Sequence, residues 1–412
     1  MPPLRPFRLP PSHILTQRRT IMTTSHLTAT QVTVRDAISQ LCKRFPPSYW
    51  RALDETATDP TEFHAAIARD GWLGIALPPD HGGSGLGISA ATTMLEAITA
   101  SGAGMAGAQS IHANVYATQP LAKFGSPSQV SSLIPDIISG RHRVCFGVTE
   151  PDAGLDTARL TTRAVKQADG SYIVTGKKIW ITCAQVAHKM ILLARTGGEG
   201  AKGLSLFCID LERGDKRLVM KRIRKMGGRA VDANEVFFDG YAIPADTLIG
   251  EEGMGFKIVL HGMNAERCLL AGEALGLGYA ALTKAVEYAK GRVVFGRPIG
   301  MNQGVAHPLA DAYMKLEAAK LATYHAARLY DEGEAGQEEI GAACNTAKYL
   351  AAEAAFTACE RAVLTHGGMG YAVEFDVERY FRDCLVPRIA PVSREMIMNY
   401  ISEKVLGLPR SY

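Results

Sequence analysis

The fold is decided by one stretch, Val148-Thr149-Glu150-Pro151-Asp152-Ala153-Gly154-Leu155-Asp156, which follows an apolar run over 144–148. The apolar run predicts a short buried strand. Proline cannot donate to a ladder and glycine adopts turn conformations, so the strand ends where Pro151 and Gly154 begin to interrupt it. The backbone amides beyond the strand and the Thr149 hydroxyl are therefore free to bind a ligand.

A second stretch, 172–182, carries another β-pattern. Polar and apolar residues alternate up to Gly176-Lys177, and the segment then resumes as Ile179-Trp180-Ile181-Thr182. This pattern predicts a hairpin with its turn at Gly176. Trp180 and Thr182 offer a flat ring and a hydroxyl to a planar cofactor, but an ordinary β-domain with a packed tryptophan fits the spacing equally well.

Both stretches resemble motifs of the acyl-CoA dehydrogenase flavoprotein family, V-T-E-P-x-A-G-S-D and G-x-K-x-W-I-T. The resemblance runs from about residue 45 to the C-terminus. It implies that the two segments cradle FAD. One position departs, because Leu155 stands where the family usually has a serine close to both the flavin and the thioester. The cofactor-binding residues implied in this region are Phe146, Val148, Thr149, Gly154, Leu155, Trp180 and Thr182, and Leu155 is also expected at the substrate.

Composition indicates a globular protein. The chain has 412 residues, 47% hydrophobic and 21% charged, enough for two or three packed regions. Its net charge of +4 and the lack of a basic patch beyond the N-terminus argue against nucleic-acid binding. We expect no membrane span, because no uninterrupted apolar run reaches roughly 18 residues. The eight cysteines are scattered without C-x-x-C pairs, so we expect neither disulfides nor a metal site.

Residues 1–24 differ from the rest of the chain. They contain Arg5, Arg8, Arg18 and Arg19, and no acidic residue precedes Asp36. This composition resembles a mitochondrial presequence, although the prolines of the first half do not suit an amphipathic helix. A disordered tail is the alternative interpretation. We expect a mitochondrial matrix protein, with a cytoplasmic or peroxisomal location as alternatives.

The order of the patterns predicts an α+β chain. Helical patterns dominate residues 25–143, strand patterns residues 144–252, and helical patterns again residues 253–412. We therefore expect an N-terminal helical domain, a small middle β-domain and a C-terminal helical bundle. In the first of these, one helix is expected to run from Phe63 to Ile75. The family resemblance implies that FAD lies between the β-domain and the C-terminal bundle.

The most informative single residue lies in a helix expected over 256–290. Its apolar stripe includes Met263 and Leu270, and Glu266 and Glu273 fall on the same stripe. A carboxylate on an apolar face costs free energy unless it is paired or functional. Burial raises a carboxyl pKa toward the range of a general base, so Glu266 is a candidate base. The alternative is a structural ion pair with Arg267 or Arg292.

The resemblance favours Glu266 as the base. Many family members carry their catalytic glutamate in a C-terminal I-Y-E-G-T segment, which here is Ile389-Ala390-Pro391-Val392-Ser393. Proline cannot act as a base and has no N–H to polarise a thioester. The branched-chain and long-chain groups instead use a helix whose pattern is similar to Ala265-Glu266-Arg267-Cys268. We therefore expect Glu266 as base and Asn264 and Arg267 at the substrate, with Glu395 as the fallback base.

Downstream motifs imply an oligomer. The segment from Arg292 through Phe295 to Gln303 resembles one that reaches the FAD of a neighbouring subunit, and arginine can clamp a pyrophosphate. Gly367 and Gly368 resemble a loop near the adenine, and Ser393 replaces a threonine that contacts flavin. We expect a homo-oligomer, a tetramer or a dimer.

The function implied is FAD-dependent α,β-dehydrogenation of an acyl-CoA to a trans-2-enoyl-CoA, with an electron-transfer flavoprotein as acceptor. A flavin oxidase or monooxygenase on the same scaffold is one alternative. A flavoprotein diverged toward a specialised biosynthetic pathway is another. A non-catalytic flavoprotein associated with nucleic acid is the binding-module alternative, and the lack of a basic C-terminal region argues against it.

Overall fold

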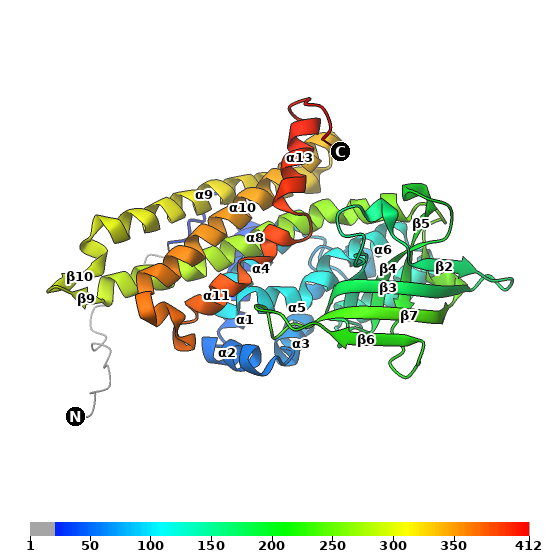
Figure 1. Ribbon diagram of the computed structural model, residues 1–412, viewed down its shortest axis with the longest axis horizontal. Helices are drawn as coiled ribbons and strands as arrows, with labels where there is room; N and C mark the ends of the chain where they lie inside the picture. Colours follow the sequence, from blue (N-terminus) through cyan, green and yellow to red (C-terminus); the bar gives the residue numbers. More distant parts are fainter. Residues whose placement is uncertain (1–20, 412) are drawn as a thin grey trace.

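The computed structural model describes residues 21–411, so the predicted targeting segment, 1–24, lies almost wholly outside the described residues. N-terminal helices and C-terminal helices pack together, and a β-sheet lies at one end of the long C-terminal helices (Figure 1). The predicted α+β class and the order helices, strands, helices are confirmed.

The N-terminal part is a cluster of seven helices. Two of them, α1 and α7, begin with capping boxes at Thr28 and Ser126, which satisfy the first free amides. The helix expected from Phe63 to Ile75 was too long: α3 ends at Arg69, because Gly71 adopts a φ of 77° and turns the chain. The helices are α1 (Ala29–Cys42), α2 (Pro47–Thr56), α3 (Thr61–Arg69), α4 (Gly87–Ile98), α5 (Gly104–Tyr116), α6 (Thr118–Phe124) and α7 (Pro127–Ile138).

The middle part is one sheet in the order β6-β7-β3-β2-β4-β5-β8, with β1 pairing in parallel to β4. The strands are β1 (Val144–Gly147), β2 (Arg163–Lys166), β3 (Tyr172–Thr182), β4 (Lys189–Arg195), β5 (Leu204–Asp210), β6 (Leu218–Arg222), β7 (Ala233–Ile243) and β8 (Leu248–Ile249). Strand β4 is almost wholly buried, because it lies in the interior of the sheet between β1, β2 and β5.

The predicted hairpin within 172–182 is wrong. Strand β3 runs unbroken through Gly176 and pairs with β2 on one side and β7 on the other. The glycine sits at a register shift in the β3–β7 ladder, where a Cβ atom would lie 2.5 Å from Thr162 Oγ1. Gly176 is therefore needed for a bulge and a close approach of neighbouring backbone, and it does not reverse the chain.

The C-terminal part is built on one long helix, α8, which packs against α4, α5, α9 and α10. Among the described residues, α8 is the one helix apolar and long enough to cross a membrane, but 83% of its apolar window is buried inside the protein. It is the core helix of the bundle. The elements are α8 (Gly255–Gly291), β9 (Val293–Val294), β10 (Arg297–Pro298), α9 (Gln303–Glu332), α10 (Gln337–His366), α11 (Val377–Asp383), α12 (Val386–Ile389) and α13 (Arg394–Lys404).

Candidate active site

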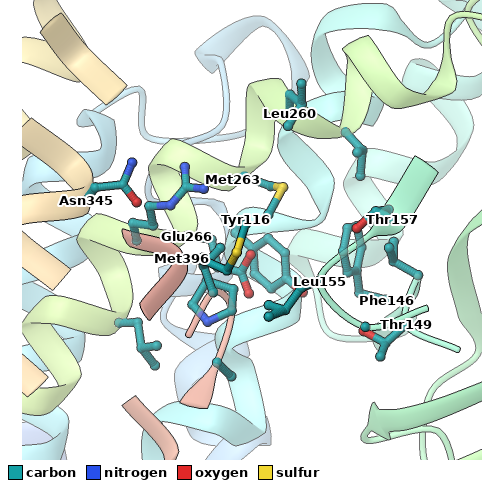
Figure 2. A pocket seen from close by; sticks show the side chains of 18 of the residues that line it. Tyr116, Phe146, Thr149, Leu155, Thr157, Leu260, Met263, Glu266, Asn345 and Met396 are labelled. Atoms are coloured by element: carbon teal, nitrogen blue, oxygen red, sulfur yellow. The ribbon is translucent and has the colours of Figure 1, made fainter. Parts of the chain in front are cut away.

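A cavity of about 780 Å³ lies between the sheet, α5, α8 and the C-terminal segment. This volume is in the range of sites that hold small ligands and cofactors. Figure 2 shows Glu266 near its centre, with Phe146, Thr149 and Leu155 on one side and Asn345 on the other. The predicted site residues that line it are Phe146, Val148, Thr149, Gly154, Leu155, Trp180, Thr182, Glu266 and Arg267.

The loop after β1 is fastened to β3 by a buried ion pair. Lys178 Nζ lies 2.9 Å from Glu150 Oε1 and 3.0 Å from the Val148 carbonyl oxygen, to which it donates. The other Glu150 oxygen accepts from the amide and hydroxyl of Thr161. Burial alone would raise the pKa of Glu150, but Lys178 and the hydrogen-bond donors lower it to about 2. Sequence reasoning quoted both residues within the motifs and missed their pairing.

Trp180 is turned toward the cavity by an irregular backbone. Its φ is 62°, and the β3–β7 register shifts between Lys178 and Ile181. A non-glycine residue in the left-handed region stores strain, which is typical of functional sites. The result is a tryptophan that lines the cavity and remains 57% exposed. The flat surface that the sequence suggested is therefore available to a ligand.

Glu266 reaches the cavity from α8. Its side chain is 12% exposed, and Figure 2 shows Tyr116, Met263, Leu155 and Met396 around it. The expected alternative, an ion pair with an arginine, is not formed. Arg267 donates to Asn264 Oδ1 at 2.7 Å, and Arg292 caps the distant end of α8.

The cationic neighbour of Glu266 is a residue that the sequence did not single out. His112 on α5 places Nε2 3.9 Å from Glu266 Oε1 and Nδ1 2.6 Å from Glu273 Oε1. Burial alone would lower the pKa of His112, but the two carboxylates outweigh it and raise this pKa to about 10. Glu266 and Glu273 lie on one helical stripe, as expected, and His112 lies against both.

The polar far side of the cavity contains Arg267 and Asn345. The Nε of Arg267 is buried and has no hydrogen-bond partner among the described residues. Asn264 binds Arg267 but does not line the cavity. Glu395, the fallback base, is 68% exposed at its side chain and lies outside the cavity lining, so the geometry disfavours it.

Six predicted cofactor residues do not line this cavity. Ser393 caps α13 by accepting a hydrogen bond from the Met396 amide. The other five lie at or near the opposite end of the long helices (Figure 1), and Phe295 is fully exposed. Three of the five belong to the segment expected to reach a neighbouring subunit, the two glycines were expected near the adenine, and within one chain these roles stay predictions. They are Arg292, Phe295, Gln303, Gly367 and Gly368.

The cavity residues fit a flavin. Thr149, Trp180 and Thr182 all line the cavity, so two hydroxyl-bearing side chains and a flat ring border the same space. A Cβ atom at Gly154 would meet open space, so the loop backbone is accessible from the cavity. A planar, polar ring system finds here a flat wall, hydroxyl partners and accessible amides. Within residues 21–411, no group of three or more His, Cys, Asp or Glu is placed to hold a metal ion.

Three family models match the chain in the observed domain order. They are described as the N-terminal, middle and C-terminal domains of acyl-CoA dehydrogenase and match residues 28–141, 145–241 and 253–406. An acyl-CoA dehydrogenase of Bacillus subtilis is 34% identical over 383 residues, covering 93% of this chain and 99% of the relative. The chain belongs to the acyl-CoA dehydrogenase family of oxidoreductases.

Two other similar proteins bear on cofactor and partner. The solved FAD complex of PigA has a TM-score of 0.87 and 27% identity, covering 94% of this chain and 100% of PigA. Subunit CarC of the caffeyl-CoA reductase–Etf complex of Acetobacterium woodii is 32% identical, covering 86% of this chain and 92% of CarC. The first similarity supports the expected cofactor, FAD, and the second the expected kind of electron-transfer partner.

Proposed function

We propose that the protein dehydrogenates an acyl-CoA thioester between its α- and β-carbons, giving a trans-2-enoyl-CoA, with FAD as cofactor and Glu266 as the base. One observation carries this proposal. The Glu266 side chain lies in the cavity that Thr149, Leu155 and Trp180 also line, and Figure 2 shows Thr149 and Leu155 on one side of it. The base and the residues proposed to hold the flavin therefore border the same space, so a substrate Cα–Cβ bond can lie between the base and the flavin.

In this proposal the chain binds and shields the cofactor. Thr149, Thr182 and the loop amides would hold the polar edge of the flavin, and Trp180 would cover a ring face. When bound, FAD supplies the acceptor for the hydride that leaves the β-carbon. Phe146, Leu155 and Met263 surround the reacting region with apolar surface, which excludes water and strengthens local electrostatic interactions.

Glu266 would take the α-proton onto a carboxylate oxygen. The α-carbon becomes acidic enough only if hydrogen-bond donors bind the thioester oxygen and stabilise its developing charge. Pro391 lines the cavity where many relatives carry their glutamate, and it offers no N–H. Arg267 lines the same cavity, and its Nη1 is held by Asn264 Oδ1, so we assign oxygen binding on the acyl-CoA to the remaining terminal donors of the Arg267 guanidinium.

The proposed electron acceptor is an electron-transfer flavoprotein, which the similarity to CarC supports. The placement of the base on α8 favours a branched-chain or long-chain substrate, as the family pattern implies. A mitochondrial matrix location remains a proposal that rests on residues 1–24.

The predicted cofactor residues that lie far from the cavity support a homo-oligomer. Glu266 and Arg292 lie roughly 39 Å apart along one helix at 1.5 Å per residue, too far to serve one cofactor's flavin and pyrophosphate within a chain. An exposed Phe295 beside Arg292 fits burial against a second copy. We propose that one chain provides the flavin half of a site and its partner the adenine half, in a dimer or a tetramer.

The first test is anaerobic titration of the FAD-loaded protein with butyryl-, isovaleryl-, octanoyl- and palmitoyl-CoA. We expect one chain class to bleach the flavin absorbance and Glu266→Gln to abolish the bleaching. Glu395→Gln is the matched control and should bleach at the wild-type rate. Failure of every acyl-CoA to bleach wild type would contradict the proposal. Fast reoxidation of the bleached flavin in air would favour the oxidase alternative.

A further inference from the structure

Three side chains form a continuous charged row from the cavity into the core. Glu266 and His112 both line the cavity, with Glu266 Oε1 3.9 Å from His112 Nε2, and Glu273 Oε1 lies 2.6 Å from the other ring nitrogen of His112. Glu273 is fully buried, and its second oxygen has no hydrogen-bond partner among the described residues. Nothing in the fold requires a carboxylate here, because α5 and α8 already pack through apolar residues such as Ile111, Leu269 and Ala265.

The geometry fixes the charge state of His112. Each of its ring nitrogens faces a carboxylate, and a neutral imidazole can donate from only one nitrogen. Both nitrogens therefore carry a proton, in agreement with the pKa of about 10 to which the two glutamates raise this group against burial. The row contains two carboxylates and one cation, so its net charge is −1.

The other titratable groups around His112 are neutral. Tyr116 lies on the same helix, with ring centroids 4.8 Å apart, and burial raises its pKa well above the ordinary value. Burial also raises the pKa of the Cys145 thiol on β1 and of the Cys183 thiol after β3. Glu266 and Glu273 on α8 are thus the charged groups that face the imidazolium.

We propose that His112 and Glu273 are positioning residues for the base: Glu273 holds the imidazolium of His112, which in turn orients the Glu266 carboxylate toward the cavity and stabilises its negative charge. This inference rests on the proposed function. At 3.9 Å the His112–Glu266 contact is an ion pair and not a hydrogen bond, so it acts through charge and leaves the carboxylate oxygens free for substrate.

The step that the row supports is proton abstraction. The α-C–H bond breaks, a Glu266 oxygen bonds the proton, and the electron pair stays on the substrate as the thioester enolate. The net charge of the row changes from −1 to zero in this step. The protein then needs no counter-ion from solvent at this part of the cavity, where Tyr116, Leu155 and Met263 lie around Glu266.

The test compares Glu273→Gln, Glu273→Asp and His112→Gln in the FAD-loaded full-length protein. Glu273→Gln keeps the size and a hydrogen-bond acceptor for His112 but removes the charge. Two rates are measured with the acyl-CoA that bleaches wild type fastest: anaerobic bleaching, and exchange of the α-hydrogen with D₂O. Glu96→Gln is the matched control, because Glu96 is a buried carboxylate on α4 that accepts from Tyr324 and does not line this cavity.

We expect Glu273→Gln and His112→Gln to lower both rates about 10- to 100-fold, with KM changed less than about threefold and FAD content unchanged. The acid limb of the pH–rate profile should move to higher pH in His112→Gln, because two carboxylates then face each other without a cation. Glu273→Asp should recover part of the loss, and Glu96→Gln should keep the wild-type rates and profile.

The outcomes separate the two proposals. Suppose that an acyl-CoA bleaches wild type, and that Glu273→Gln and His112→Gln keep the wild-type rates and pH profile. This result would overturn the positioning role and leave the proposed function intact. A loss that Glu273→Asp does not reduce, or an equal loss in Glu96→Gln, would mark His112–Glu273 as a structural pair. Should His112→Gln not fold, Glu273→Gln and Glu273→Asp decide alone. Wild type that no acyl-CoA bleaches overturns both.

Discussion

Lys178 Nζ lies 2.9 Å from Glu150 Oε1, and this buried pair joins the middle of β3 to the loop after β1. Lys178 also donates to the Val148 carbonyl, and the Ile179 amide donates to the Thr149 carbonyl, so several contacts hold the two motifs of the site together. The placement of the cavity wall depends on this join.

Removal of the Lys178 charge should loosen the site. Lys178→Met leaves Glu150 buried without a counter-ion, so we expect a loss of about 3–5 kcal/mol of stability together with a lower FAD content. Lys177→Met is the control. The ion pair between Lys177 and Glu235 is partly exposed, so its loss should lower the stability by less than about 1 kcal/mol. Urea unfolding and the flavin-to-protein absorbance ratio measure both quantities. Equal losses in the two variants would contradict the prediction.

Substitution of Trp180 should change cofactor binding without lowering the stability of the apoprotein. Trp180→Gly removes an exposed ring and relieves a φ of 62°, so the apoprotein should be as stable as wild type or about 1 kcal/mol more stable. FAD affinity should fall at least about tenfold, because the ring wall is lost. Apoprotein unfolding and flavin fluorescence titration measure the two effects. Trp50→Gly is the contrasting variant: loss of this buried side chain should lower the free energy of unfolding by about 3–5 kcal/mol. A destabilised Trp180→Gly apoprotein would contradict the idea of a strained, ligand-facing residue.

Mixed oligomers test whether two chains share one site. Glu266→Gln and Arg292→Gln should each be nearly inactive alone. In co-refolded dimers, one site in each heterodimer contains both natural residues, so roughly a quarter of the wild-type activity should return. The double variant Glu266→Gln/Arg292→Gln, co-refolded with Glu266→Gln, should recover nothing. Absence of recovery in the first mixture would place Arg292 outside the partner's site.

The pH dependence of the protein's stability should show the contribution of the protonated His112 side chain. The pKa of this group is raised to about 10 in the folded protein by Glu273 and Glu266 against burial, from about 6.5 in the unfolded chain. Its contribution to stability is therefore fully present below about pH 6.5 and is lost as the pH rises through 10. The unfolding midpoint of wild type should fall across this window more steeply than that of His112→Gln. Parallel curves for the two proteins would show that His112 does not titrate in this way.

The sequence predicted those parts of the fold that rest on local pattern. The strand at 144–147 and the helix at 255–291 have strongly apolar or long patterns and were predicted to within a residue or two. Strands β2 and β6 have no comparable pattern, because they are short and mostly exposed, with one buried residue each. The Gly176 error has another cause: turns and bulges both use glycine, and pairing with a distant strand decides between them.

The candidate site was predictable where the motifs are contiguous. The loop residues and Glu266 meet in one cavity, as the resemblance implied. His112 was not predictable, because a lone histidine on a helix carries no signal until α5 is packed against α8. The partners of Glu150 and Lys178 were hidden for the same reason: both residues are quoted in the motifs, yet the contact between them depends on tertiary structure.

The two sides of the cavity differ in how strongly the core holds them. Glu266 projects from α8, a helix that is buried along most of its length. Other lining residues, Val392, Met396 and Tyr400, come from the C-terminal segment, where Ile397 is the one buried residue of α13. Substitutions in that segment reshape the cavity at little cost to folding and leave the base in place. Over evolutionary time, selection can thus change which substrate fits the cavity while the proposed proton chemistry at Glu266 is inherited intact.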